Sequence, residues 1–135
     1  SVGAWVVPLD ALAECWVDGP PQDPPPLPHL ACPEPRGLDL ALTLEVNGAV
    51  VSRTNARHLY WSMAQQLAHL TSNGALARTG DLFATGTVSG PEPGSEGSLF
   101  ELWRGERWLA DGDTVVIRGD GPGGADLGQV TGTVV

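Results

Sequence analysis

Glu101 is the acidic side chain whose setting most suggests chemistry. It lies in the apolar run "SLFEL", directly after a loop crowded with Gly, Pro and Ser. Read as a strand, this run places Glu101 on one face with Leu99, and a solvent-facing glutamate there is ordinary. Alternatively, the carboxylate faces a cleft and orients a histidine base, with Thr87 of "GTVSG" offering a hydroxyl to the same cleft. The pattern alone leaves both readings open.

The histidines do not form a recognisable metal motif. A pair of histidines at i and i+4 of a helix can bind a metal, but the residue four positions after His58 is Ser62. On a helix, His58 and His69 would be about three turns apart. A polar helical face that contains Ser62, Gln65 and both histidines is therefore read as a solvated face, and no two-histidine site is predicted.

Two further motifs are interpreted as turns. The stretch "GDGPGG", Gly119 to Gly124, matches the glycine pattern of dinucleotide sites, but Pro122 interrupts it and a strand follows rather than a helix. The nearby aspartates lack the spacing and the closing glutamate of a calcium-binding loop. They are Asp111, Asp113, Asp120 and Asp126. Turn formation is the better interpretation of both patterns.

The composition excludes some classes of function. The 135 residues carry a net charge of −9, and the seven basic side chains are all arginines. Nucleic-acid binding is not expected, because it requires phosphate neutralisation by Lys and Arg, and an acidic surface also repels anionic membranes. No apolar stretch approaches the length of a membrane span. The two cysteines, Cys15 and Cys32, are too few for a disulfide scaffold, so a reduced, cytoplasmic protein is expected.

The hydrophobic pattern predicts a mainly β fold with one amphipathic helix. Leucines alternate with polar residues over Leu38–Val46, and Asn47-Gly48 is the preferred pair for a type I′ hairpin turn. Apolar residues at helical spacing predict a helix over Thr54–Leu70, capped by Thr54 or Asn55. Further strands are predicted in "DLFATGTV", "SLFELW", "RWLA", "TVVIRG" and "LGQVTGTVV". We expect a rolled or sandwiched sheet.

The segment Asp18–Pro35 holds eight of the twelve prolines. Its composition is typical of a linker or a polyproline II segment that could bind an SH3 domain. It lies, however, between a strand-like run and the predicted hairpin. An ordered crossover loop within one domain is an equal alternative on composition alone.

Several segments together resemble the fumarylacetoacetate hydrolase family. They are "WVVPLDAL", "QDPPPLPHL", "YWSMAQQLAHLTSNG", "GDLFATGTVSGPE" and "LADGDTVVIRG", and the similarity runs from Trp5 to about Val134. Wider members of the superfamily, such as acylpyruvases and oxaloacetate decarboxylases, share mainly the "GD-x-x-x-TGT" part. The added "YW-x-M-x-QQL-x-H" and "GT-x-SGPE" elements favour the fumarylacetoacetase branch.

The resemblance implies an enzyme that hydrolyses a carbon–carbon bond of fumarylacetoacetate, giving fumarate and acetoacetate in tyrosine and phenylalanine catabolism. It implies that Glu101 orients a catalytic histidine and that Thr87 binds substrate. His29, His58 and His69 do not match that histidine. A divalent metal, Mg²⁺ or Ca²⁺, is implied as a Lewis acid. No residue of this chain matches a metal ligand of the family.

By the same resemblance, residues 1–135 are the C-terminal part of a fumarylacetoacetase-like catalytic domain, expected to be inactive alone, and the full-length protein is expected to be a homodimer. It also implies that the proline-rich segment is ordered. The alternatives are a non-catalytic β-rich remnant or binding module, and another activity of the superfamily, such as that of an acylpyruvase or a decarboxylase.

Overall fold

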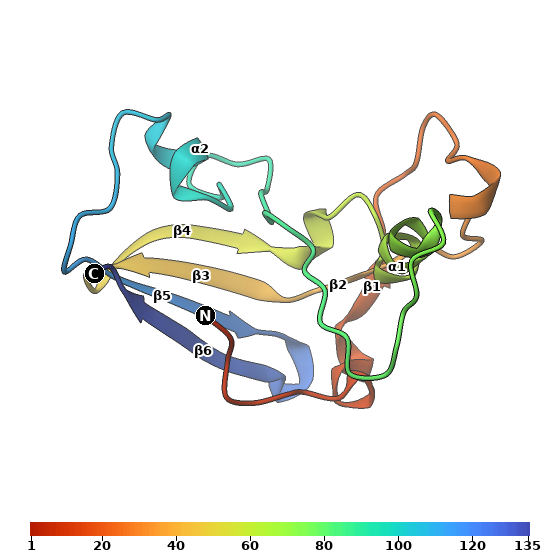
Figure 1. Ribbon diagram of the computed structural model, residues 1–135, viewed down its shortest axis with the longest axis horizontal. Coiled ribbons are helices and arrows are strands. Elements are labelled where there is room, and N and C mark those ends of the chain that lie inside the picture. The colour runs from red at the N-terminus through yellow and green to blue at the C-terminus, as the bar shows by residue number, and fades with distance from the viewer.

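Antiparallel strands in two sheets form the framework of the computed structural model, which describes residues 1–135 (Figure 1). The larger sheet has the strand order β4-β3-β5-β6, and the smaller sheet pairs β1 with β2. The strands are β1 (Trp16–Asp18), β2 (Arg36–Leu38), β3 (Ala41–Val46), β4 (Ala49–Asn55), β5 (Thr114–Asp120) and β6 (Asp126–Thr133). The α-helices are α1 (Met63–Thr71) and α2 (Leu99–Trp103), and the four 3-10 helices are η1 (Leu9–Cys15), η2 (Pro28–Leu30), η3 (Ala56–His58) and η4 (Pro122–Gly124). The prediction of a mainly β fold is confirmed.

Two hairpins build the larger sheet. Asn47 and Gly48 connect β3 to β4 with φ angles of 52° and 78°. Both angles are positive, as a type I′ turn requires, so the predicted hairpin is confirmed. The "GDGPGG" stretch connects β5 to β6 through η4, which confirms that it is a turn. Strand β3 then pairs with β5 without a register shift, from Ala41 opposite Asp120 to Val46 opposite Val115.

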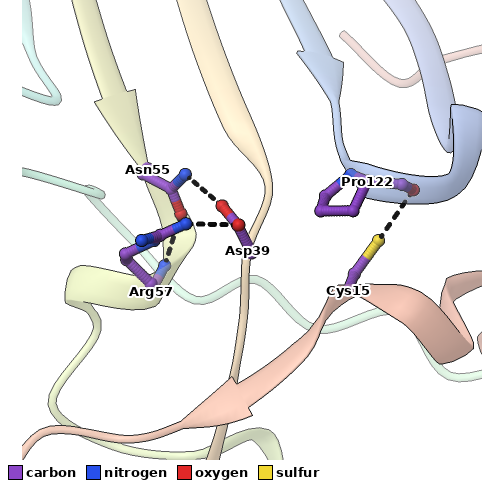
Figure 2. Close-up of polar contacts among 5 residues, drawn as sticks. All are labelled: Cys15, Asp39, Asn55, Arg57 and Pro122. Carbon is purple, nitrogen blue, oxygen red and sulfur yellow. Dashed lines mark hydrogen bonds and ion pairs between the residues drawn. The ribbon is translucent and has the colours of Figure 1, made fainter.

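The predicted strand Leu38–Val46 is interrupted between β2 and β3. At the break, the Asp39 backbone N–H donates to the Cys15 carbonyl at 2.7 Å, which extends the pairing of β2 with β1 beyond Leu38 and Trp16. The Asp39 carboxylate accepts a hydrogen bond from the Asn55 amide at 2.7 Å and forms an ion pair with Arg57 (Figure 2). These contacts with β4 and η3 divide the predicted strand into two.

The buried core lies where the two sheets meet. It consists of Leu12, Cys15, Leu38 and Leu40. Cys15 is fully buried, and its thiol donates to the Pro122 carbonyl at 3.7 Å, which links η1 to the β5–β6 turn (Figure 2). Cys15 and Cys32 are not joined by a disulfide.

The main helix is shorter than predicted. Thr54 and Asn55 complete β4, and Asn55 caps the 3-10 helix η3 rather than a long helix, since its side chain accepts a hydrogen bond from the Arg57 N–H. Helix α1 begins only at Met63, with Ser62 as its N-cap. The Ser62 hydroxyl accepts from the Gln65 N–H, and the Gln65 side chain accepts from the Ser62 N–H, which is a capping box.

Gln65 is buried and connects α1 to the proline-rich segment, so the predicted solvated face is wrong at this residue. Its carbonyl oxygen accepts from the Gln22 side chain at 3.0 Å and from the Ser62 N–H at 3.1 Å. Its amide nitrogen donates to Gln22 at 2.8 Å and to the Leu30 carbonyl at 2.9 Å. These bonds anchor the segment between β1 and β2, which is a long connection between two antiparallel neighbours within one sheet rather than the predicted crossover.

Two more predicted strands, Asp81–Val88 and Arg107–Ala110, are wrong, because neither segment adopts regular strand structure. The strands at the edges of the larger sheet are β4 and β6, and neither segment adds to them. Their apolar side chains stay exposed, and Leu82 and Trp108 are 81% and 70% exposed. None of the helices has the length and apolar character needed to cross a membrane.

We expect Gln65→Leu to lower the free energy of unfolding by about 2 kcal/mol, because it puts an apolar side chain at a buried site and leaves half-buried groups of Gln22, Leu30 and Ser62 without their partner. The measurement is urea unfolding of the complete gene product. Gln66→Leu is the matched control, since the half-buried Gln66 side chain makes one bond, to the Trp61 carbonyl. Equal losses for the two variants would contradict the role of Gln65.

The Arg57 and Asn55 hydrogen bonds, together with the charge of Arg57, hold the pKa of Asp39 below its ordinary value of 3.8. A lowered folded-state pKa stabilises the fold above pH 3.8, and this contribution is lost as the pH falls through the folded-state pKa. Asp39→Asn should therefore lower the Tm at neutral pH. The difference in Tm between the variant and the wild type should shrink as the pH falls below 3.8 and through the folded-state pKa of Asp39. Asp111→Asn, at an exposed carboxylate, should show no such pattern in thermal unfolding scans.

Candidate active site

Glu101 lies on a short helix, so the predicted strand "SLFELW" is wrong. The hydroxyl of Ser98, the N-cap of α2, accepts a hydrogen bond from the Glu101 N–H at 3.2 Å. The helix ends at Arg104, which adopts a left-handed conformation with φ of 53°. Ser98 and Glu101 form the S-x-x-E pattern that is typical of a helix N-terminus. This local signal outweighs the apolar alternation from which the strand was predicted.

The Glu101 carboxylate is exposed and is held by neutral donors. The Ser89 hydroxyl donates to Oε2 at 2.7 Å, and the Ser98 hydroxyl reaches the same oxygen at 3.3 Å. These hydroxyls, the first of them most strongly, and the backbone N–H groups of Ser98 and Gly97 lower the pKa of Glu101 below its usual range. The side chain is therefore an ionised carboxylate at neutral pH, and it has no arginine partner.

A tightly folded loop, residues 86–98, carries Ser89 to this position. A β-carbon built on Gly97 would lie 2.3 Å from the Val88 carbonyl oxygen, so only glycine fits. The loop is fixed to β4 by the Arg53 N–H, which donates to the Gly94 carbonyl at 2.8 Å, and by the Ser52 hydroxyl, which donates to the Glu96 carbonyl at 2.7 Å. Figure 1 shows the loop and α2 beside β4.

Thr87, in the same loop, lines a pocket of about 170 Å³ over strands β3, β4 and β5. Two buried oxygens in this pocket have no hydrogen-bond partner, Thr54 Oγ1 and Glu96 Oε2. The pocket therefore offers unused polar atoms to a bound molecule. Glu101 is not among the residues that line it. The loop places Thr87 two residues from Ser89, the direct partner of Glu101, without bringing Thr87 and Glu101 into one pocket.

No histidine of the chain is bonded to Glu101. His58 lies against the loop, since its ring would be 3.1 Å from a β-carbon on Gly90, and His69 lines a separate pocket with Trp61 and Phe83. No group of three or more His, Cys, Asp or Glu side chains is arranged to hold a metal ion. The residues of this chain therefore do not form a metal site by themselves.

Comparison with known proteins identifies the wider family. The model of the fumarylacetoacetate (FAA) hydrolase C-terminal family matches residues 1–135. The chain belongs to the fumarylacetoacetate hydrolase family. Its curated relatives include the fumarylacetoacetase of Homo sapiens, 42% identical over 88% of this chain and 33% of the human protein. The fumarylacetoacetase of Arabidopsis thaliana is 41% identical over all of this chain and 37% of the plant protein. That of Mus musculus is 40% identical with the same coverage.

The chain thus spans about a third of the length of these relatives. The family resemblance predicted Glu101 and Thr87 as site residues of this part of the fold. The sequence did not predict the groups that hold Glu101. Ser98 could have been found from the capping-box pattern. Ser89 and Gly97 have no such local signal, because their contact depends on how the loop folds back.

Gly97→Ala should displace residues 86–98, since the added methyl group overlaps the Val88 backbone. We expect a loss of about 1 to 3 kcal/mol in the free energy of unfolding and faster hydrogen exchange at the amide of residue 97. Gly132→Ala in β6 is the control, because its new β-carbon would meet only the Ser1 hydroxyl at an ordinary 3.5 Å. Unchanged exchange at residue 97 would contradict the close contact.

Proposed function

We propose that the protein carrying this chain hydrolyses fumarylacetoacetate to fumarate and acetoacetate, a step of tyrosine and phenylalanine catabolism. The observation that carries the proposal is the Glu101 carboxylate, ionised, free of cations and held by Ser89 and Ser98 within a chain of the fumarylacetoacetate hydrolase family. Identities of about 40% to proteins named fumarylacetoacetase support the substrate assignment. Within the family this favours fumarylacetoacetate over the substrates of acylpyruvases or decarboxylases.

In this reaction, water attacks a carbonyl carbon, the adjacent carbon–carbon bond breaks, and its electron pair leaves with the acetoacetate carbon, which then takes a proton. A histidine base would remove the proton of the water. Glu101 would accept the other ring N–H of that histidine, fix its orientation and stabilise the imidazolium that forms. We propose that this histidine lies outside residues 1–135, as the family resemblance implies; none of the hydrogen bonds to the Glu101 carboxylate comes from a histidine of this chain.

Thr87 is proposed to bind substrate from the pocket over the larger sheet, where the free oxygens of Thr54 and Glu96 also lie. A divalent metal, Mg²⁺ or Ca²⁺, held by residues other than those of this chain, would supply Lewis-acid polarisation of the diketone. We further propose that the complete protein acts as a cytoplasmic homodimer.

Glu101→Gln in the complete gene product should lower kcat for fumarylacetoacetate by about 10²- to 10⁴-fold, because an amide cannot stabilise the imidazolium. The Tm should change little, since Glu101 is exposed. Hydrolysis is followed by the loss of the diketone absorbance.

Glu106→Gln, at an exposed glutamate just beyond α2, is the matched control and should keep its turnover. Near-wild-type kcat for Glu101→Gln would remove the catalytic role of Glu101. A wild-type protein that leaves fumarylacetoacetate intact would contradict the proposed reaction.

A further inference from the structure

The hydroxyl of Ser89 stands between a backbone donor and the Glu101 carboxylate. The Gly97 N–H donates to Ser89 Oγ at 3.0 Å, and Ser89 Oγ lies 2.7 Å from Glu101 Oε2. A serine hydroxyl has a single hydrogen. Because its oxygen already accepts from Gly97, and the carboxylate can only accept, the hydroxyl hydrogen points to Glu101. The direction of this hydrogen-bond chain is therefore fixed.

The backbone on each side of Ser89 is held in place. The next residue, Gly90, donates its N–H to the Ser95 carbonyl at 2.8 Å, and a β-carbon there would meet Ser95 Oγ at 2.8 Å. On the other side, the Val88 backbone touches Gly97. Ser89 thus cannot shift without opening the loop, and its hydroxyl is a preorganised donor for the carboxylate.

Other groups are weaker candidates for fixing the carboxylate. No arginine pairs with Glu101, and the Ser98 hydroxyl lies 0.6 Å farther from Oε2 than the Ser89 hydroxyl does, at 3.3 Å against 2.7 Å. Ser98 also accepts the Glu101 N–H as the helix cap. Among the causes that lower the pKa of Glu101, the Ser89 hydrogen bond is the largest.

We propose that Ser89 is a positioning residue for the reaction, whose hydroxyl holds the Glu101 carboxylate turned toward its histidine partner and leaves the second carboxylate oxygen, Oε1, free to accept the imidazole N–H. This inference rests on the proposed function of Glu101. It assigns Ser89 a task that an arginine would perform less well, because a cation at this position would compete with the imidazolium for the carboxylate charge.

The test compares Ser89→Ala, Ser89→Thr and Ser95→Ala in the complete gene product. Ser89→Ala should lower kcat by about 10- to 100-fold with little change in KM, because the carboxylate loses its orientation. Ser89→Thr keeps the hydroxyl and should recover most of the turnover. Ser95→Ala is the matched control in the same loop, since it keeps the backbone carbonyl that accepts from Gly90, and the hydroxyl it removes bonds to the Glu92 carbonyl and not to Glu101.

A second measurement follows the carboxylate directly. The protein is labelled with ¹³C-glutamate, and the NMR signal of Glu101 is assigned as the one that disappears in Glu101→Gln. In Ser89→Ala, the Glu101 signal should titrate at a higher pH than in the wild type, closer to the usual value of about 4.3. Ser89→Thr and Ser95→Ala should keep the lowered pKa. A purely structural role for Ser89 would change the unfolding midpoint without moving this titration.

A double-mutant cycle separates the two proposals. If Ser89 acts through Glu101, adding Ser89→Ala to Glu101→Gln should cause no further loss of kcat. If the two substitutions lower kcat by factors that multiply, or if Ser89→Ala leaves the Glu101 titration unchanged, the role of Ser89 is overturned. An inactive Glu101→Gln would still uphold the role of Glu101 in that case. Near-wild-type turnover of Glu101→Gln would instead overturn both.

Discussion

Gly97 lies so close to Val88 that a β-carbon on it would be 2.3 Å from the carbonyl oxygen, and the candidate site depends on this backbone contact. It closes residues 86–98 into a compact loop and presents the Gly97 N–H to the Ser89 hydroxyl. The Ser89 hydroxyl in turn donates to the Glu101 carboxylate. Ser98, the residue after Gly97, is the N-cap of the helix that carries Glu101. Without the contact, Ser89 and Ser98 would have no fixed relation to one another.

The chain holds its candidate carboxylate with neutral donors although carboxylate–arginine pairs occur elsewhere in the fold. Asp39, between β2 and β3, pairs with Arg57 of η3, and Glu45 of β3 pairs with Arg118 of β5. Hydroxyl and amide donors also favour the ionised carboxylate, but they bring no positive charge. Glu101 therefore keeps its full negative charge for a cation that forms during a reaction, as an imidazolium does. This arrangement suits a group that orients and stabilises a histidine base.

Local patterns predicted the elements whose geometry is set by neighbouring residues. The alternation around Asn47-Gly48 was sufficient for the β3–β4 hairpin, and "GDGPGG" for the β5–β6 turn. The helix starts at Ser62 and Ser98 were missed, although both follow the S-x-x-E/Q capping pattern, because the apolar spacing was weighed first. The burial of Gln65 and the bond from Ser89 to Glu101 join residues distant in the sequence, and no local pattern encodes such contacts.

The same loop governs both parts of the proposed site. Thr87 lines the pocket over the larger sheet, and Ser89, two residues later, holds Glu101 outside that pocket. Between them lies Val88, whose backbone is packed against Gly97. A movement at this contact would shift the Thr87 hydroxyl and the Glu101 carboxylate together, and with them the two proposed roles. Under the proposed roles, rigid backbone packing, rather than a direct bond between Thr87 and Glu101, would relate substrate binding to catalysis in this part of the protein.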